Sequence, residues 1–436
     1  MVSDAWHKIG RRKKLKRRTQ MKNTMKKTNL ISMSLIAALA LSACQPNKHN
    51  KSNTQKSTTV TVQAEKMDAQ ELAHAAEQLV GPYTFMIASR VANEALQKDP
   101  HNLKALFISK LLKRFEAFRG IYTRLRSYLK ADQLAEFDKW IQEFPESPMK
   151  RYLTAPGKPI HTVTDLQDVL SQYYSGIEEF REFLKQNQGS EFDIELNANV
   201  FEQEIRREMY NKCQTATVGD EVTVNCDYSD IAKKKINSAD MIALRQMISG
   251  ELLIGIFYNS YSLEGVEKIN DDNLTPQQKT EILMNTPTFG HLRSQNSFKL
   301  LRDIGSDLSS AVKWAVQYQK NLCPQGVETE YQRRGYLFEQ GLCVDSTSTV
   351  LQRFMATLDQ ALGGITKIDM EKSDGTLVPM NVNLFAWSTK PIQDLRQIAP
   401  VGWNSCGLAT SLRDNTLGGM FVDNNYNVLM DTDCNQ

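Results

Sequence analysis

Apolar residues recur at steps of three and four along most of the chain between residue 67 and about residue 363, which predicts a mainly helical protein. The first helix is expected over 68–79, ending before Gly81-Pro82, and the second continues to Lys98, ahead of Asp99-Pro100. Two helices joined by so short a turn are expected to pack as an antiparallel pair. Stacked pairs of this kind are therefore the expected architecture of this region.

Five later stretches carry the same helical period: 103–130, 164–184, 241–258, 306–319 and 348–362. Thr164 is the expected N-cap of the second stretch, and Ser306 or Asp307 begins the fourth. Stretch 241–258 is apolar nearly all round, and Arg245 and Glu251 interrupt it. We therefore expect it to be the central core helix rather than a membrane span.

Three hairpins are expected among the helices. Thr and Val alternate around Gly219-Asp220, and pairing residue 218 with 221 puts Cys213 opposite Cys226. After Gly364, stretches 365–371 and 376–382 flank the turn Asp374-Gly375, and 419–422 and 426–430 flank a third turn at 423–425. A helical turn is expected over 391–398. The strings 391–396 and 414–419 are distinctive but match no motif of known activity.

Small residues on the second helix carry a family resemblance. Ala88, Ala92, Ala95 and the terminating Pro100 resemble the second helix of a tetratricopeptide repeat, over residues 69–102. An aromatic residue expected near Ala92 is missing, and no second copy follows 34 residues later. A general antiparallel helix pair would show the same pattern. The expected fold class is thus mainly α, with antiparallel helix pairs in a TPR-like or irregular helical array and a few short β-hairpins.

An apolar run near the N-terminus points to export. Residues 30–41 carry no charge and follow the basic patch Met25-Lys26-Lys27, which is typical of a signal peptide and too short to span a bilayer. The run closes with Leu41-Ser42-Ala43-Cys44, which resembles the lipobox of bacterial lipoproteins. The resemblance implies that the Cys44 thiol carries a diacylglycerol, that cleavage occurs just before Cys44, and that its new amino group is acylated. The alternative is a chance apolar run beside a core cysteine.

Cys44 divides the chain into parts of different character. Residues 1–43 are expected to be the signal peptide, with Met21 and Met25 as alternative starts, and 44–66 the lipid anchor and a polar tether. A helical domain over 67–363 and a mixed region with hairpins over 364–436 follow. In lipoproteins an aspartate after the cysteine favours the inner membrane. Gln45 therefore implies an outer-membrane lipoprotein facing the periplasm or the cell surface.

Charge is distributed unevenly about the same cysteine. Residues 1–43 contain 11 Lys and Arg against one acid, and the remainder contains 42 against 49, so the mature protein is expected to be acidic. The basic run 11–18 lies before the cleavage point, which argues against nucleic-acid binding. Stretch 103–130 has eight basic residues and one acid. It is either an interaction surface for an anionic partner or an outer face neutralised by acids such as Glu136, Asp138 and Glu143. The candidate surface residues are Lys110, Lys113, Arg114, Arg119, Arg124 and Arg126.

Six cysteines remain after Cys44, an even number that suits an oxidising compartment. By spacing they form three local pairs, Cys213 with Cys226, Cys323 with Cys343 and Cys406 with Cys434. Only the first pair is supported by a hairpin register, in which the facing side chains lie at disulfide distance. Buried free thiols are the alternative for that pair. Metal binding is not expected, because no CxxC or HxxxH spacing occurs.

A search for catalytic motifs finds no GxSxG, HExxH, P-loop or dinucleotide fingerprint, which favours a role without catalysis and without a cofactor. His291 is a candidate catalytic residue, but an ordinary surface or core histidine is the more common case. Asp423, Asp431 and Asp433 offer oxygen ligands for calcium, yet they lack the glycine of a calcium loop.

The sequence as a whole predicts a lipid-anchored helical binding or scaffolding protein of the bacterial envelope. Such a protein would hold a protein or small ligand in grooves between helix pairs, with the membrane as a further partner. The alternatives are an envelope hydrolase without a recognisable motif, and an accessory lipoprotein of a transporter or secretion complex. A deep polar pocket with His291 beside carboxylates would favour the hydrolase, and a concave, aromatic-lined groove would favour binding.

Overall fold

The helices and strands below come from a computed structural model of the chain, and 61% of the residues that it describes are helical. Apart from residues 271 and 273, the described residues belong to one compact unit. The expected mainly α fold is therefore confirmed. The described residues are 67–81, 84–143, 148–188, 190, 194–197, 213–218, 221–226, 233–236, 238–269, 271, 273–294, 296–322, 349–371, 376–405, 407 and 409–423.

The first two expected helices are confirmed as α3 (Ala69–Gln78) and α4 (Phe85–Lys98), which pack on each other. A capping box begins α3: the Asp68 carboxylate accepts from the Glu71 backbone N–H at 2.8 Å, and the Glu71 carboxylate accepts from the Asp68 N–H at 2.9 Å. Ala88, Ala92 and Ala95 on α4 are fully buried, because their small side chains let neighbouring helices approach closely. This packing fits both a general helix pair and a tetratricopeptide-like unit.

The helical period of 103–130 does not produce one continuous helix. The stretch forms α5 (Leu103–Lys113), the 3-10 turn η1 (Arg114–Phe118) and α6 (Ile121–Leu125). The cause is Gly120, which has a left-handed φ of 68° and donates its N–H to the Tyr152 carbonyl at 2.9 Å. A Cβ at this position would lie 2.4 Å from the Ala155 carbonyl oxygen. The chain turns here and continues into α7 (Ala131–Glu143) and α8 (Pro148–Thr154).

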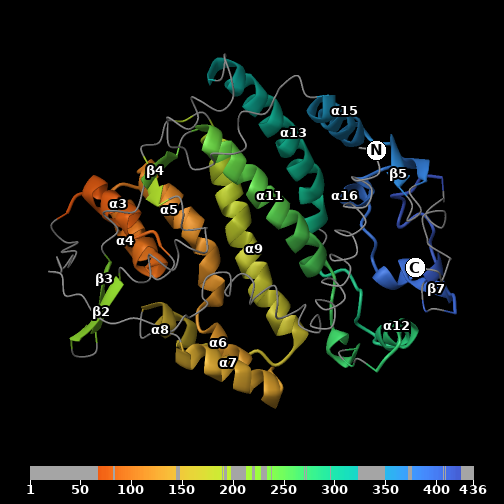
Figure 1. The fold of residues 1–436 in the computed structure, drawn as a ribbon, viewed down its shortest axis with the longest axis horizontal. Coiled ribbons are helices and arrows are strands. Elements are labelled where there is room, and N and C mark those ends of the chain that lie inside the picture. The colour runs from red at the N-terminus through yellow and green to blue at the C-terminus, as the bar shows by residue number, and fades with distance from the viewer. Residues whose placement is uncertain are drawn as a thin grey trace, which may run out of the picture. The chain divides into compact units, whose positions relative to one another are not determined.

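Three long helices form the centre of the unit: α9 (Val163–Gln186), α11 (Ser238–Ser260) and α13 (Asn296–Leu322). Figure 1 shows α11 between the other two, and α11 packs on both. The N-cap of α9 is Thr162 rather than Thr164, because the Thr162 hydroxyl accepts from the Asp165 backbone N–H at 3.1 Å. Gly255 on α11 permits the close contact with α9, since a Cβ there would lie 2.3 Å from the Tyr174 ring.

The helix expected over 241–258 is central, as predicted, but only one of its faces belongs to the core. One face of α11 is buried against its neighbours, including Ile248, Leu252 and Ile256. The opposite face leaves Met247 60% and Ile254 51% exposed, with Phe257 and Tyr258 beside them. The apolar composition of α11 therefore reflects a core face and a second, solvent-exposed apolar face. No helix in the described part of the chain is long and apolar enough to cross a membrane.

The helix expected to begin at Ser306 or Asp307 begins ten residues earlier, at Asn296. Asp307 is not a cap but a buried residue in the middle of α13, where basic side chains of α9 and α11 bind it. The helix expected over 348–362 is confirmed as α15 (Thr349–Gly363), which packs on α13. Between α11 and α13 lie η3 (Val266–Ile269) and α12 (Pro276–Met284).

The strands form four antiparallel pairs among the described residues. β2 (Cys213–Val218) pairs with β3 (Glu221–Cys226) in the expected register, with Cys213 opposite Cys226 and Val218 opposite Glu221. β5 (Thr366–Glu371) and β6 (Leu377–Val382) confirm the second expected hairpin. The other two pairs are β1 (Ile194–Asn197) with β4 (Lys233–Ile236), and β7 (Pro400–Trp403) with β8 (Ala409–Leu412).

The end of the described chain differs from expectation. The helical turn expected over 391–398 is the shorter 3-10 turn η4 (Leu395–Ile398), which follows α16 (Ala386–Thr389). Of the third expected hairpin, only its first half and Asp423 are described, and there Phe421 bridges to Val382 at the end of β6. Stretch 426–430 lies outside the described residues.

The string 414–419 is a side-chain-capped turn. The Asp414 carboxylate accepts from the backbone N–H groups of Thr416 at 2.8 Å and Gly418 at 2.9 Å. The Leu417 carbonyl accepts from the Trp387 indole N–H at 2.8 Å. The Asp414 bonds stabilise the turn itself, and the Trp387 bond attaches it to α16.

Candidate functional site

An open groove of about 750 Å³ lies between α5 and the C-terminal half of α9. Because α9 rises about 1.5 Å per residue, the groove follows that helix for about 16 Å from Ser175 to Gln186. The lining thus covers about three turns of α9. Its lining residues are His101, Leu103, Leu106, Lys110, Ser175, Glu178, Glu179, Glu182, Phe183, Gln186 and Asn187.

The two walls of the groove differ in chemistry. The α5 wall presents Leu103 and Leu106, one helical turn apart, with Lys110 beyond them. The α9 wall presents the carboxylates of Glu178 and Glu182, which are four residues apart and so lie on the same side of the helix. The apolar stripe that the sequence shows on α9 faces the other way, with Tyr173, Ile177 and Leu184 buried.

The three glutamates of the α9 wall are in different electrostatic states. Glu179 accepts from Lys110 at 2.8 Å and from Lys113 at 2.7 Å, and these bonds hold its pKa below the usual value. Glu182 forms an ion pair with Arg181 at 2.8 Å. Glu178 is half-buried and has no hydrogen-bond or ion-pair partner in the described part of the chain. Burial raises the pKa of Glu178, because the charged form loses hydration.

A buried ion-pair cluster lies at the same level of α9, on the side away from α5. The Asp307 carboxylate of α13 pairs with Arg181 of α9, with Arg245 of α11 at 2.8 Å and with Lys185 of α9 at 3.2 Å. Arg245 also donates to the Gln188 side-chain oxygen at 2.6 Å. The cluster joins the three central helices, and it fixes the position of Arg181, to which the groove residue Glu182 is bound.

A second polar cluster joins the middle of α9 to α11 and η1. The buried Tyr173 hydroxyl donates to the Glu251 carboxylate, and Arg114 pairs with the same carboxylate at 3.4 Å. Burial raises the pKa of Tyr173 far above its usual value, so this phenol stays protonated. Gly176 permits the close approach, because a Cβ there would lie 2.6 Å from the Arg114 Cα. This arrangement is structural: it satisfies polar groups where the helices cross.

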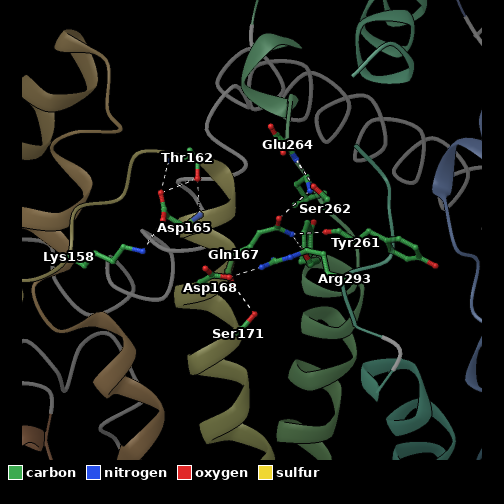
Figure 2. Close-up of polar contacts among 12 residues, drawn as sticks. Lys158, Thr162, Asp165, Gln167, Asp168, Ser171, Tyr261, Ser262, Glu264 and Arg293 are labelled. Atoms are coloured by element: carbon green, nitrogen blue, oxygen red, sulfur yellow. Dashed lines mark hydrogen bonds and ion pairs between the residues drawn. The ribbon is translucent and has the colours of Figure 1, made fainter. Parts of the chain in front are cut away.

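The N-terminal part of α9 carries the third cluster, shown in Figure 2. The buried Gln167 side chain donates to the carbonyls of Tyr258 at 2.8 Å and Tyr261 at 2.7 Å, and accepts from the Leu263 N–H at 3.2 Å. Asp168 pairs with Arg293 at 2.6 Å. The Gln167 side chain thus provides hydrogen-bond partners for backbone groups at the C-terminus of α11, which have no partner within the helix.

Most of the basic side chains proposed from the sequence as an interaction surface have partners within the protein. Lys110 and Lys113 bind Glu179, and Arg114 binds Glu251. Arg126 pairs at 2.5 Å with Asp138, one of the acids expected from the sequence to neutralise this face. Arg124 donates to the carbonyls of Ala117 and Lys158, both at 3.1 Å, and Arg119 is exposed.

His291 lies outside the groove lining, and its side chain is 53% exposed. It lies 3.6 Å from Asp394 and contacts Arg396. Arg396 binds the Asp394 carboxylate and thereby lowers its pKa. His291 therefore stands beside a carboxylate but in an exposed position, and not in the deep polar pocket that would favour a hydrolase.

The other candidate residues are placed as follows. The Asp423 carboxylate accepts from the Asn381 side-chain amide at 2.7 Å, and Asp431 and Asp433 lie outside the described residues. No group of three or more His, Cys, Asp or Glu suited to a metal occurs among the residues searched, which are the described ones. Cys213 and Cys226 face each other in the backbone register. The remaining cysteines, Cys44, Cys323, Cys343, Cys406 and Cys434, lie outside the described residues.

Comparison with known protein families, with curated proteins and with solved structures gives no match. The groove therefore has to be interpreted from its own residues. Sequence reasoning predicted grooves between helix pairs but missed Glu178 and Glu182, because it followed only the apolar stripe of α9. The signal that was present is the run of glutamates at 178, 179 and 182 on the opposite, polar face.

Proposed function

We propose that this chain is a lipid-anchored protein of the bacterial envelope that binds a partner in the groove between α5 and α9. The observation that carries the proposal is the groove itself, which combines apolar side chains on one wall with a half-buried Glu178 on the other, for which the described residues provide no hydrogen-bond or ion-pair partner. A half-buried carboxylate loses part of its hydration, and a bound cation offsets that cost.

The anchor part of the proposal rests on the sequence Leu41-Ser42-Ala43-Cys44 after an uncharged apolar run. Diacylglycerol on Cys44 together with an acylated amino group gives several chains, which hold a protein at a membrane much more firmly than one. The polar stretch 45–57 then serves as a tether that lets the helical part reach a partner. Gln45 favours the outer membrane as the site of the anchor.

Site-specific photocrosslinking in intact cells tests the binding role. Ser175 lines the groove and is exposed, and Ser171 lies one helical turn earlier on α9, exposed but outside the lining. With p-benzoylphenylalanine in place of each serine, irradiation should give a discrete adduct at position 175 and none at 171. Equal adducts at both positions, or none at 175, would refute binding in this groove.

Metabolic labelling tests the anchor separately. Cys44→Ala should leave an unprocessed precursor that no longer incorporates labelled palmitate, because only the thiol can form the thioether. Cys213→Ala serves as the control and should incorporate label like the natural chain. Unchanged incorporation by Cys44→Ala would contradict the lipid anchor and leave the groove proposal standing.

A further inference from the structure

We infer that the occupant of the groove between α5 and α9 is an extended peptide segment in which basic and apolar residues alternate. The inference rests on the proposed binding function and adds the chemical class of the ligand. It follows from the charge of the α9 wall, from the apolar side chains Leu103 and Leu106 on the α5 wall and from the length of α9 that borders the groove.

The charge of the α9 wall favours a cation at Glu178. Glu179 and Glu182 already have cationic partners within the protein, namely Lys110, Lys113 and Arg181. Glu178 has none among the described residues, and its only nearby positive charge is Arg181, which is committed to Asp307 and Glu182. An ammonium or guanidinium group of a ligand would form a charge-assisted hydrogen bond with Glu178 in a partly desolvated setting.

Neighbouring carboxylates strengthen this preference. Burial, together with the negative charges of Glu182, Asp303 and Glu179, raises the pKa of Glu178, and Arg181 acts in the opposite direction. The ionised form of Glu178 is therefore stabilised less than it would be in water. A ligand cation supplies the missing positive charge, whereas an anionic ligand would add to the repulsion.

The apolar wall argues for a peptide rather than a small cation. Leu103 and Leu106 on α5 face the groove opposite the glutamates, with Phe183 also in the lining. A small polyamine would satisfy Glu178 but leave Leu103, which is 38% exposed, and the partly exposed Leu106 in water, whereas Phe183 is already buried. A ligand that is cationic on one side and apolar on the other covers both walls.

The dimensions of the groove fit an extended segment. Successive side chains of a β-strand point to opposite sides, and those on one side repeat about every 6.7 Å. Residues four apart on a helix have Cβ atoms about 6 Å apart, so Glu178 and Glu182 match that repeat. The about 16 Å of α9 that borders the groove accommodates about five extended residues. Lysines would then face α9 while leucines face α5.

Fluorescence anisotropy with a defined probe tests the inference on the full chain. The probe is a labelled, end-capped hexapeptide of alternating lysine and leucine, and the matched peptide has glutamate in place of lysine. We expect saturable binding of the lysine peptide only. Glu178→Gln should weaken it at least tenfold, and Glu136→Gln, an exposed acid on α7, should change it less than twofold. Equal affinity of Glu178→Gln and the natural chain would overturn the inference.

Three further measurements keep the result interpretable. Circular dichroism establishes that the variants fold, and Glu178→Lys should reverse the preference in favour of the glutamate peptide. Spermine at the same charge concentration should compete at least tenfold more weakly than the lysine peptide, because it cannot cover Leu103 and Leu106. Competition as strong as that of the peptide would identify the site as one for small cations and overturn the peptide assignment.

The inference and the proposed function fail in distinguishable ways. An adduct at position 175 in cells, without binding of the lysine peptide, would leave a binding groove with a ligand of other chemistry. Absence of the adduct at position 175 in cells would refute binding in the groove as the function of the protein, even if the lysine peptide binds in vitro.

Discussion

Arg181 on α9 and Asp307 on α13 form an ion pair in which the two residues are only 1% and 4% exposed. Arg245 of α11, which is 2% exposed, pairs with the same carboxylate at 2.8 Å. Two buried guanidinium groups therefore share the Asp307 carboxylate, and Arg181 has Glu182 as a second, more exposed partner. Removal of one member of such a cluster leaves uncompensated charge in the interior, which is far more costly than loss of a surface pair.

Asp307→Asn should consequently lower the free energy of unfolding by about 3–5 kcal/mol, because the asparagine side chain has the same shape but no charge to offset Arg181 and Arg245. Urea denaturation followed by circular dichroism measures the change. Asp359→Asn is the control, since its carboxylate pairs with Lys313 at 2.8 Å in an exposed position on α15. A loss for Asp307→Asn no larger than that of the control would show that the buried cluster is not needed for stability.

Two glycines of α11 provide a matched pair of substitutions. A Cβ on Gly250 would have no heavy atom within 4 Å, and one on Gly255 would lie 2.3 Å from the Tyr174 ring. Gly250→Ala should stabilise the protein by about 0.5–1 kcal/mol through helix propensity. Gly255→Ala should destabilise it, because the ring or one of the helices has to move. Thermal unfolding measures the melting temperature of each variant relative to the natural chain. Shifts of the same sign for both variants would contradict the packing of α9 on α11.

The capping box at the start of α9 predicts a pH dependence. Hydrogen bonds from the backbone N–H of His161 and from Thr162 lower the pKa of Asp165 to about 2. A carboxylate with a lowered pKa stabilises the folded state above its unfolded value near 4, and this contribution disappears as the pH falls through about 2. The natural chain should therefore have a higher melting temperature than Asp165→Asn at pH 7, and the difference should shrink steadily as the pH is lowered from about 4 to about 2. A difference independent of pH would argue against the capping role.

The register of β2 and β3 supports a covalent link. Cys213 and Cys226 are backbone partners at the open end of the hairpin. Peptide mapping of unreduced protein exported by its natural host should recover the two cysteines in one linked pair. Replacing both by serine should lower the free energy of unfolding by about 3 kcal/mol, in the chain-entropy model for a loop of this size. Quantitative alkylation of both thiols without prior reduction would refute the link.

Local patterns predicted this fold well where short-range chemistry decides the structure. The hairpin register between Cys213 and Cys226 follows from a period of two and a two-residue turn, which leave one pairing. Gly81 and Asp99 likewise mark the ends of α3 and α4 within a few residues. These features depend on residues close together in the sequence.

Features that depend on distant residues were mispredicted or missed. Asp307 has the residue type of an N-cap, and only Arg181 and Arg245, more than 60 residues away, reveal it as a buried ion-pair partner. The period of 103–130 continues in sequence through Gly120, yet the contact with Tyr152 and Ala155 turns the chain there. The half-buried position of Glu178, without a partner among the described residues, follows only from the packing of α5 beside α9, which the sequence does not show.

The three polar clusters engage α11 at its end, at its middle and in its first half, through Gln167 of α9 and through Glu251 and Arg245 of α11. A partial separation of the central helices would break the hydrogen bonds or ion pairs of at least one cluster. The polar groups of that cluster would lose their partners before water could replace them. The two helices should therefore separate only when the whole unit unfolds. In deuterated solvent, the inward-facing amides of α9 are then the last to take up label, and they do so at the rate of global unfolding.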